Sequence, residues 1–590
     1  MSDDGMRRRR VLRLSAGVLG AGVVSASAAA ETGATTDDED EDAADTPLPS
    51  VTDVTFHDLD TEGLELGDVS VPGGETLGPV ASVGSGGFAV DDDGTLAFYG
   101  VADGGPEVDA ENAEALTGRS ADYFCGDTRP ATIRPVPDYT PSVYRIGIGS
   151  DGTAGLTDRT ELTDAAGDGI STLSNPLSDA APMFSVEGER VPFDPNGLDL
   201  EAVARTADGT FWVGEEYAPS VAKVGADGEV LARYVPASLE STLDGATYPV
   251  RGALPAVFER RDRGIESVGV GPDDETVYFA LQSPLANPDP AAFESSRNVR
   301  VGAFDPETER VSAQYLYRLD RPETFEADVA AGDVAQSDVK VSELSVLGTD
   351  RLLVLERVSR TTKFYVVDLS DVPPVPDAYD DPETRPTLAQ VDPASDPELE
   401  AVPKRLLFTT DDHEGFPTKL EAIAQPTPDE LLIANDSDYE LFGAETRVAR
   451  VELSGPLGAD YYQVDFLAGE PIEELGEEGL YADQDRLLRY AWGNTDEGVT
   501  DRGSAWASAD VRNCLADYGH VVETDDGARV TFTVAEGCEL TLSLAVHSMP
   551  GEAFSADTVD QQVLLDSTTE TFGPGEHTIE IDLPSDGGRA

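Results

Sequence analysis

The feature that most constrains the fold of this chain is a two-stranded unit that recurs along its middle. The stretch "DLEAVARTADGTFWVGEEY" (199–217) has a short apolar run, an Asp-Gly turn and a second run rich in aromatic and β-branched residues, which predicts a β-hairpin. Four more stretches share this pattern, and in each the longer second strand ends in polar residues. They are residues 86–104, 264–283, 340–359 and 419–438. A hairpin repeated in this way predicts a fold built from copies of one unit.

Two further strands often follow the hairpin, so that a unit has four antiparallel strands. Four-stranded units repeated around an axis are the blades of a β-propeller. The alternative is a β-sandwich or several unrelated β domains, but the equivalent glutamates of successive units are too far apart for sandwich hairpins. The sequence therefore predicts an all-β chain with a propeller over 51–500. Five units are evident, and we predict six blades, the sixth assembled from strands near 51–57 and 440–470.

The last segment, 505–590, has a different pattern. Its apolar and polar residues alternate between Gly and Pro turns, which predicts a small β-sandwich accessory domain. Cys514 and Cys538 both lie in this segment, and in an exported protein they could form a disulfide, which would leave Cys125 over. The chain has no Cys-x-x-Cys motif or Cys/His cluster, which argues against a zinc site.

The N-terminus, 1–30, has the pattern of an export signal. A run of arginines precedes a Gly- and Ala-rich apolar stretch that ends at Ala28-Ala29-Ala30, a cleavage site of the A-x-A type. The arginines resemble a twin-arginine signal, which exports folded proteins. We expect an extracellular or cell-surface protein without a transmembrane anchor after signal removal, since the apolar stretch is short for the alternative, an uncleaved anchor. The acidic segment 31–50 is expected to be a disordered linker.

The charge of the chain argues against one class of partner. Asp and Glu number 115 against 40 Lys and Arg, which gives a formal net charge of −75. A nucleic-acid partner is not expected, because binding a phosphate backbone requires a basic surface. The acidic excess runs through the whole chain, as in proteins that work in concentrated salt, where the Debye length falls to about 3 Å.

The repeat places carboxylates at one position of the predicted blades. In a propeller the first strand of each blade lines the central channel, and four of these strands carry a Glu near the start, whereas the first unit has Gly86 and Gly87. Carboxylates that converge on a partly dry channel repel one another unless a cation is present, and oxygen ligands suit Ca²⁺. The alternative is that they pair with nearby basic residues or face a wide hydrated channel. The candidate metal ligands are Glu201, Glu266, Glu343, Glu421, Glu216 and Asp436, and Glu266 and Glu343 are also the candidate catalytic residues. Of Glu215 and Glu216, strand alternation allows only one to face inward.

Basic residues also fall on the repeat, although the chain is poor in them. They can form plain ion pairs with the carboxylates, or they can hold an anionic substrate, with Arg giving bidentate contacts to phosphate. A bound metal would then polarise the phosphoryl oxygen and lower the pKa of a water that attacks phosphorus. A G-x-S-x-G motif is absent from the sequence, so the sequence shows no catalytic motif of a serine hydrolase. The candidate substrate-binding residues are Arg263, Lys340, Arg357 and Lys419.

Several of these motifs, taken in order, resemble one family. "LEAVA", "RDRGIESVGVG", "KVSELSVLG" and "KLEAIA" resemble the phytase-like family described as having esterase-like activity of phytase, over roughly residues 80–455. The resemblance implies a β-propeller related to the alkaline propeller phytases, whose calcium ions sit in an acidic channel and activate water against a phosphoester. Two departures are Gln282, where an acidic residue is usual, and the missing carboxylate of the first unit. The C-terminal segment resembles an accessory β domain of haloarchaeal exported proteins.

Two functions of different classes follow. The first is an exported, Ca²⁺-dependent hydrolase of phosphoesters, expected to be a monomer that acts on a small anionic substrate. The second is a non-catalytic surface propeller that is stabilised by Ca²⁺ and binds a ligand or a cell-envelope component.

Overall fold

The described part of the chain covers most of the predicted domains. The computed structural model describes residues 48–583 except 82–83, 91–95, 103, 150–151, 178–179, 207, 261–262, 272–273, 371, 428, 456, 458–460, 473–474, 476–478, 495–497, 506, 525–526, 550–561, 563 and 582. The export signal predicted at 1–30 and most of the linker predicted at 31–50 lie outside the described residues. Within the described ranges, no helix has both the length and the apolar character needed to cross a membrane.

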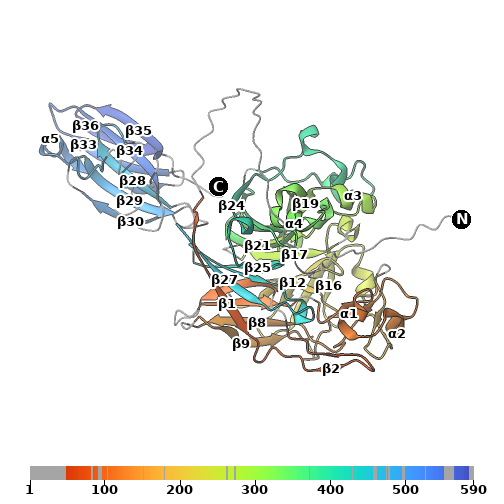
Figure 1. The fold of residues 1–590 in the computed structure, drawn as a ribbon. Helices are drawn as coiled ribbons and strands as arrows, with labels where there is room; N and C mark the ends of the chain where they lie inside the picture. Colours follow the sequence, from red (N-terminus) through yellow and green to blue (C-terminus); the bar gives the residue numbers. More distant parts are fainter. Residues whose placement is uncertain are drawn as a thin grey trace, which may run out of the picture. The chain divides into compact units, whose positions relative to one another are not determined.

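Five blades form a propeller (Figure 1); their strands pair antiparallel except at two outer edges, and two of the blades are joined in one eight-stranded sheet. Each inner strand contacts the inner strand of the next blade, and the last contacts the first, so the ring is closed. The inner strands are β4 (Gly84–Val90), β12 (Leu200–Arg205), β17 (Ile265–Val270), β21 (Lys340–Gly348) and β25 (Leu420–Thr427). The all-β class and the propeller are therefore confirmed.

The other strands of each blade follow the inner strand outward. The first blade adds β5 (Leu96–Val101), β8 (Ser142–Ile148) and β9 (Ala154–Glu161), and the second β13 (Phe211–Glu215), β14 (Ser220–Val224), β15 (Val230–Pro236) and β16 (Val250–Leu254). The third adds β18 (Val277–Leu281), β19 (Asn298–Asp305) and β20 (Arg310–Arg318), and the fourth β22 (Arg351–Arg357), β23 (Thr362–Asp368) and β24 (Lys404–Thr409). The fifth adds β26 (Glu430–Asn435), β27 (Arg447–Leu453) and β1 (Val51–Asp60).

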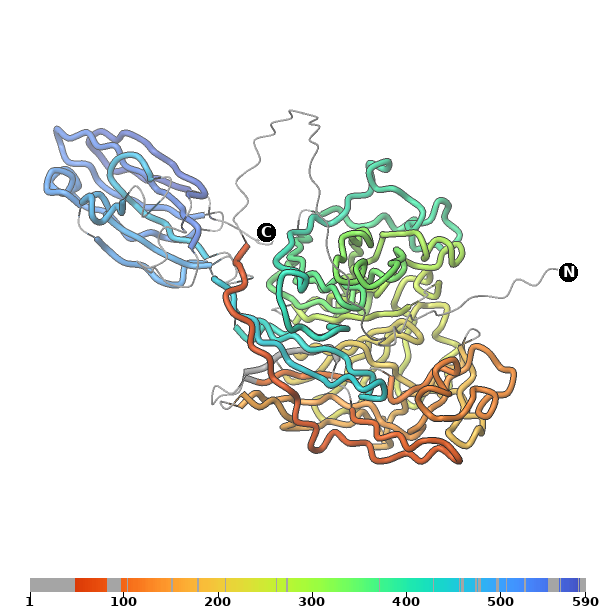
Figure 2. Tube along the Cα trace, in the orientation of Figure 1, coloured from red at the N-terminus to blue at the C-terminus, as the bar shows by residue number. Residues whose placement is uncertain are grey.

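The two ends of the propeller segment meet in the fifth blade. Strand β1 pairs antiparallel with β27, with Thr55 opposite Arg450, and its last residues pair parallel with β9 of the first blade. Figure 2 shows the red N-terminal segment running beside the cyan strands. The prediction of a sixth blade is wrong among the described residues, because the strands expected to form it complete the fifth blade instead.

The second strands are buried on both sides because each blade is stacked between two others. Every residue of β13 and of β18 is buried. Between the second and third blades, for example, the ring of Phe304 lies 4.8 Å from that of Tyr234 and 5.6 Å from that of Trp212. This burial explains why these strands are nearly continuous apolar runs in the sequence, without the polar alternation of a half-exposed strand.

A second domain begins at β28 (Tyr461–Ala468), which pairs with β34 (Leu540–Met549). One sheet has the order β30-β29-β28-β34-β35, and a second contains β31, β32, β33 and β36. The remaining bounds are β29 (Leu487–Asn494), β30 (Gly498–Ser504), β35 (Leu564–Phe572), β31 (Leu515–Tyr518), β32 (Val522–Thr524), β33 (Gly527–Val534) and β36 (Gly575–Ile581). The sheets share one hydrophobic core that includes Phe466 and Phe532. The boundary predicted near 500–505 is therefore too late, because β28, β29 and β30 pair with C-terminal strands.

Helices and short strands are confined to connections. The helices are α1 (Ala113–Thr117), α2 (Ala121–Cys125), α3 (Pro290–Ser295), α4 (Glu326–Ala331) and α5 (Ala509–Cys514). The short strands are β2 (Val69–Ser70), β3 (Thr76–Leu77), β6 (Val108–Asp109), β7 (Thr132–Ile133), β10 (Met183–Phe184) and β11 (Arg190–Val191).

The sulfur atoms of Cys514 and Cys538, 24 residues apart, are bonded to each other. A cross-link over a loop of this length stabilises a fold by about 3 kcal/mol, mainly by restricting the unfolded chain. We expect the Cys514→Ser, Cys538→Ser double variant to lose about this much free energy of unfolding in urea denaturation followed by tryptophan fluorescence. Equal stability of the variant and the parent would contradict this expectation.

Candidate functional site

All five inner strands begin with a β-bulge. In each blade the register between the inner strand and the second strand skips one residue of the inner strand. The skipped residues are Ser85, Glu201, Glu266, Ser342 and Glu421. A bulge redirects a side chain at the rim of a sheet, and bulges are common beside active sites. One backbone feature thus places three of the four predicted glutamates at the same end of the ring.

Glu343 does not occupy this position. The register skips Ser342, and Glu343 pairs with Leu355 in the ladder. The Glu343 side chain is 1 % exposed, and its Oε1 accepts a hydrogen bond of 2.8 Å from the backbone N–H of Leu344. The prediction that Glu343 is equivalent to the other three glutamates is wrong, because a shift of one residue along a strand moves a side chain to the opposite face.

Next to each bulge, the hairpin ladder ends in a pair of residues that we call the tip pair. In the second, fourth and fifth blades, the bulge residue and the tip pair supply three side chains at one end of the ring. The tip pairs of the second to fifth blades are Asp199 with Glu216, Gly264 with Gln282, Lys340 with Arg357, and Lys419 with Asp436. The tips of the second blade are therefore acidic and those of the fourth blade basic, although the backbone is the same.

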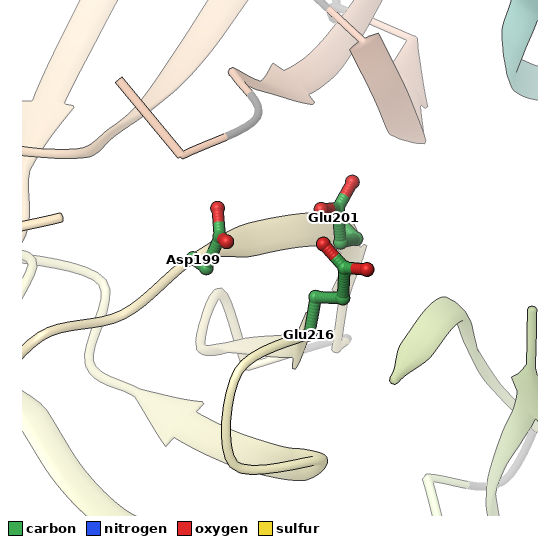
Figure 3. Close-up of side chains that lie close together, drawn as sticks. All are labelled: Asp199, Glu201 and Glu216. Carbon is green, nitrogen blue, oxygen red and sulfur yellow. The ribbon is translucent and has the colours of Figure 1, made fainter. Parts of the chain in front are cut away.

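The second blade forms an acidic triad. Asp199, Glu201 and Glu216 each place a carboxylate oxygen within 4.8 Å of the other two. Figure 3 shows Glu216 reaching from the neighbouring turn toward Glu201, with Asp199 beside them. Asp199 is buried and the two glutamates are half-buried. The structure brings the predicted Glu201 and Glu216 together with Asp199, which sequence reasoning missed. The signal for Asp199 was its place directly before an inner strand, where Lys340 and Lys419 stand in their blades.

Glu215 points away from the triad and is fully buried. Its carboxylate lies 2.5 Å from the guanidinium of Arg233 on β15, and it accepts a hydrogen bond of 3.0 Å from Ser220 Oγ. Arg233 also donates to the carbonyl of Gly197, at 3.1 Å. The pair therefore holds both the segment that leads into Asp199 and the strand end that presents Glu216, and Glu216 is the one of the two glutamates that joins the site.

A second buried arginine supports the triad from the first blade side. Arg134 donates to the carbonyl of Gly104 at 2.7 Å and to the hydroxyl of Tyr217 at 3.0 Å, and it forms an ion pair of 2.8 Å with Glu107. Gly104 has φ +47°, and a Cβ at this residue would collide with Oδ1 of Asp199. Glycine at 104 thus leaves the space that the Asp199 carboxylate occupies.

Glu266 on the third blade connects the acidic triad to the basic side of the ring. Burial raises its pKa, the charge of Lys340 opposes that shift, and the charge of Glu216 adds to it. Burial lowers the pKa of Lys340 well below the usual value, and the cations Arg357 and Arg263 lower it further. These effects act only over short distances, so Glu266, Glu216 and Lys340 belong to one electrostatic cluster.

Arg357 of the fourth blade and Lys419 of the fifth blade form ion pairs. Arg357 is buried and pairs with Glu421, and burial lowers its pKa to about 10. Lys419 Nζ lies 2.5 Å from Asp436 and 2.7 Å from Asp438. The structure therefore holds Glu421 and Asp436 against cations, as in the plain ion-pair alternative, and outside the group of three carboxylates that meet in the second blade.

Arg263, the remaining predicted anion contact, is half-buried and precedes the third blade. It donates to Ser283 Oγ at 3.0 Å and to the carbonyl of Ser337 at 3.1 Å. The structure thus replaces the expected ring of four equal carboxylates with a divided ring, whose acidic side is the second blade and whose basic side is the fourth blade.

Comparison with protein families decides the family of the chain. Residues 84–439 match the model of the phytase-like family, described as esterase-like activity of phytase. The chain belongs to this family. The matched residues run from β4 to the end of the fifth-blade hairpin and thus include the bulge residues of all five blades and the tip pairs of the second to fifth.

The similarity to individual relatives and to solved structures is lower or covers less of the chain. An uncharacterized secreted protein of Arthroderma benhamiae is 25% identical over 224 residues, which cover 34% of this chain and 43% of that protein. The chain therefore spans less than half the length of this relative. The PQQ-bound aldose sugar dehydrogenase of Streptomyces coelicolor aligns at 9% identity over 69% of this chain and 99% of its own, with a TM-score of 0.26. A gluconolactonase of Xanthomonas campestris aligns at 10% identity over 69% and 98%, also with a TM-score of 0.26.

Proposed function

We propose that this chain is an exported, Ca²⁺-dependent hydrolase of phosphoesters whose active site is the bulge end of the propeller ring. The observation that carries the proposal is the divided ring, in which three carboxylates meet on one blade and buried cations gather two blades away, with Glu266 between them. A metal-assisted hydrolase of an anionic ester needs both halves: oxygen ligands for a cation, and basic groups for the substrate. Membership of the phytase-like family supports the same reaction class.

The acidic triad fits a calcium ion. Calcium binds oxygen at 2.3–2.6 Å, so two oxygens on one ion lie at most about 5 Å apart. The carboxylate oxygens of Asp199, Glu201 and Glu216 meet this limit, since they lie within 4.8 Å of one another. When bound there, the ion would supply polarisation of a phosphoryl oxygen and a water of lowered pKa. Glu421 and Asp436 stay outside our proposed ligand set because each forms an ion pair with a cation, and Glu266 stays outside because the charge of Lys340 acts on it.

The basic side of the ring would bind the phosphate group. Lys340 lies at the tip of the fourth blade beside Arg357, whose Nε is buried and has no hydrogen-bond partner among the described residues. A guanidinium beside an ammonium gives a bidentate and a point-charge contact to a phosphate dianion. The dianion would also reduce the repulsion between these cations. Glu266, adjacent to both halves, is our candidate catalytic carboxylate.

The proposal is tested by hydrolysis of p-nitrophenyl phosphate. We expect chelation of Ca²⁺ to abolish the activity, re-addition to restore it, and Glu216→Gln to lower kcat/KM at least tenfold, because the triad loses one charged ligand. Glu259→Gln is the matched control, since it removes the same charge from an exposed side chain outside the site.

The outcomes separate the alternatives. Hydrolysis that persists after both chelation and Glu216→Gln would contradict the metal-dependent mechanism. Hydrolysis of p-nitrophenyl acetate without any phosphatase activity would support a carboxylic ester as substrate. Inactivity on a panel of phosphoesters and esters, together with Ca²⁺-dependent stability, would support a binding propeller.

Export and a monomeric state are part of the same proposal. The arginine-rich N-terminal pattern supports the twin-arginine route, and the related protein of Arthroderma benhamiae is described as secreted. The measurement is the N-terminus of the protein recovered from culture medium, which should begin after Ala30.

A further inference from the structure

A cleft of about 610 Å³ lies on the outer half of the third blade. Its walls are α3, the start of β19, the end of β20 and residues 389–392 of the following long loop. Asn298 holds the loop wall in place, because its Nδ2 donates to the carbonyls of Leu388 and Val391 at 2.8 Å each. The cleft is formed by outer strands, whereas the site proposed above lies on inner strands and their tip pairs.

Two arginines in this cleft have unused donors. Arg297 Nε donates to the carbonyl of Leu319 at 2.5 Å, which fixes the guanidinium, and its two terminal nitrogens donate to no protein acceptor in the described ranges. Arg318 Nη1 lies 3.2 Å from Asp392, while its Nε is buried without a hydrogen-bond partner among the described residues. The terminal nitrogens of Arg297 are held in place by the hydrogen bond from its Nε, and an acceptor on a ligand in the cleft would satisfy them.

The charges around Arg297 also favour an anion. Burial lowers the pKa of Arg297, and the charges of Arg318 and Arg321 lower it further. The nearby carboxylate of Asp320 is already bound by Lys363 at 2.7 Å and by Lys404 at 2.8 Å. Arg297 is thus repelled by two neighbouring arginines, of which Arg318 also lines the cleft, in a chain of net charge −75 with only 40 Lys and Arg. An anion between Arg297 and Arg318 would reduce the repulsion between these two arginines.

The acidic residues of the cleft limit how much negative charge a ligand can carry. Asp289 Oδ1 accepts a hydrogen bond of 3.0 Å from the backbone N–H of Ala291, and Asp392 pairs with Arg318. These two carboxylates line the cleft together with the arginines, which disfavours a long polyanion and favours one compact anion.

We propose that this cleft is a second ligand site, which binds one small oxyanion bearing phosphate or carboxylate groups through Arg297 and Arg318. Both chemistries suit the planar donor set of a guanidinium. The site is independent of the phosphoester site proposed above, and its occupant need not be a substrate.

The test is calorimetric titration of the full chain with inorganic phosphate and, separately, with malonate. We expect at least tenfold weaker binding of the preferred anion in Arg297→Gln and in Arg318→Gln. Arg310→Gln removes the same charge at the other end of β20 and should change affinity less than twofold. Arg357→Gln, at the tip of the fourth blade, should also leave this binding event in place.

Two results would overturn the proposal. The first is anion binding that is lost in Arg357→Gln and kept in Arg297→Gln and Arg318→Gln. This result would place the anion at the bulge end of the propeller ring. The second is no saturable binding of either anion below about 10 mM. Because Arg297→Gln loses a hydrogen bond to Leu319 and could misfold, tungstate-soaked crystals of the unmodified protein provide a second measurement. An anomalous peak between Arg297 and Arg318 is expected, and its absence at a saturating concentration would contradict the site.

Discussion

Replacing Arg233 by methionine is expected to lower the free energy of unfolding by about 3–5 kcal/mol. Arg233 and Glu215 are both fully buried, and their charged groups lie 2.5 Å apart. Without the guanidinium, the Glu215 carboxylate is left as an uncompensated charge in the protein interior, and the carbonyl of Gly197 loses a hydrogen-bond donor. Urea denaturation of the variant and the parent, at one pH and one Ca²⁺ concentration, measures the loss.

A double variant separates the ion pair from simple loss of packing. In Glu215→Gln with Arg233→Met, no buried charge remains, so the double variant is expected to be more stable than Arg233→Met alone. If both variants lose the same free energy, the buried charge is not the cause. Because Arg233 also anchors the segment before Asp199, Arg233→Met should weaken the proposed binding of Ca²⁺ to the acidic triad, which a calcium titration of the folded variant would show.

Replacing Asp465 by asparagine is expected to change the free energy of unfolding of the C-terminal domain differently at two pH values. The change should be about 4 kcal/mol more stabilising above pH 7 than near pH 4. Asp465 is completely buried on β28, and burial raises its pKa from 3.8 to about 7. Between these two pH values the folded domain keeps the proton on Asp465 and the unfolded chain releases it. The free energy of unfolding of the parent therefore falls as the pH rises from about 4 to 7. The Asp465→Asn variant lacks this loss because asparagine does not titrate.

The measurement is the free energy of unfolding at pH 4.5 and at pH 8.5 for the parent and for Asp465→Asn. Asp517→Asn is the matched control, because it makes the same chemical change at an exposed residue of β31. The difference between Asp465→Asn and the parent should grow with pH, while that of the control stays constant. A pH-independent difference for Asp465→Asn would show that the folded domain holds Asp465 ionised.

Much of the fold could be predicted because the hairpin repeat is local. The five hairpins, with their apolar second strands, are encoded within about 20 residues each, and burial between blades accounts for their composition. The number of blades could not be predicted in this way. Strand β1 is polar enough to be an edge strand in a propeller of five blades or of six. Its pairing with β27 joins residues about 400 positions apart, as in the hydrogen bond between Thr52 and Glu452.

The candidate site shows the same division. Glu201, Glu216, Lys340 and Arg357 were found from the repeat because their sequence positions mark the hairpin tips. Glu343 was wrongly aligned with them, and Asp199 was missed. Both errors arise from the bulge, since one extra residue at the start of the inner strand decides which side chain faces the ring and no residue type in these stretches marks its position.

The sequence by itself determined that the chain is built from repeated hairpins and which charges stand at their tips. Only the tertiary structure decided how those charges combine. It closed the ring at five described blades, gathered three carboxylates on the second blade, and placed cations against Glu421 and Asp436. The physical reason is that a strand exposes alternate residues, so its pattern is visible locally, whereas the partner of a charged group depends on register and on neighbouring blades that are distant in sequence.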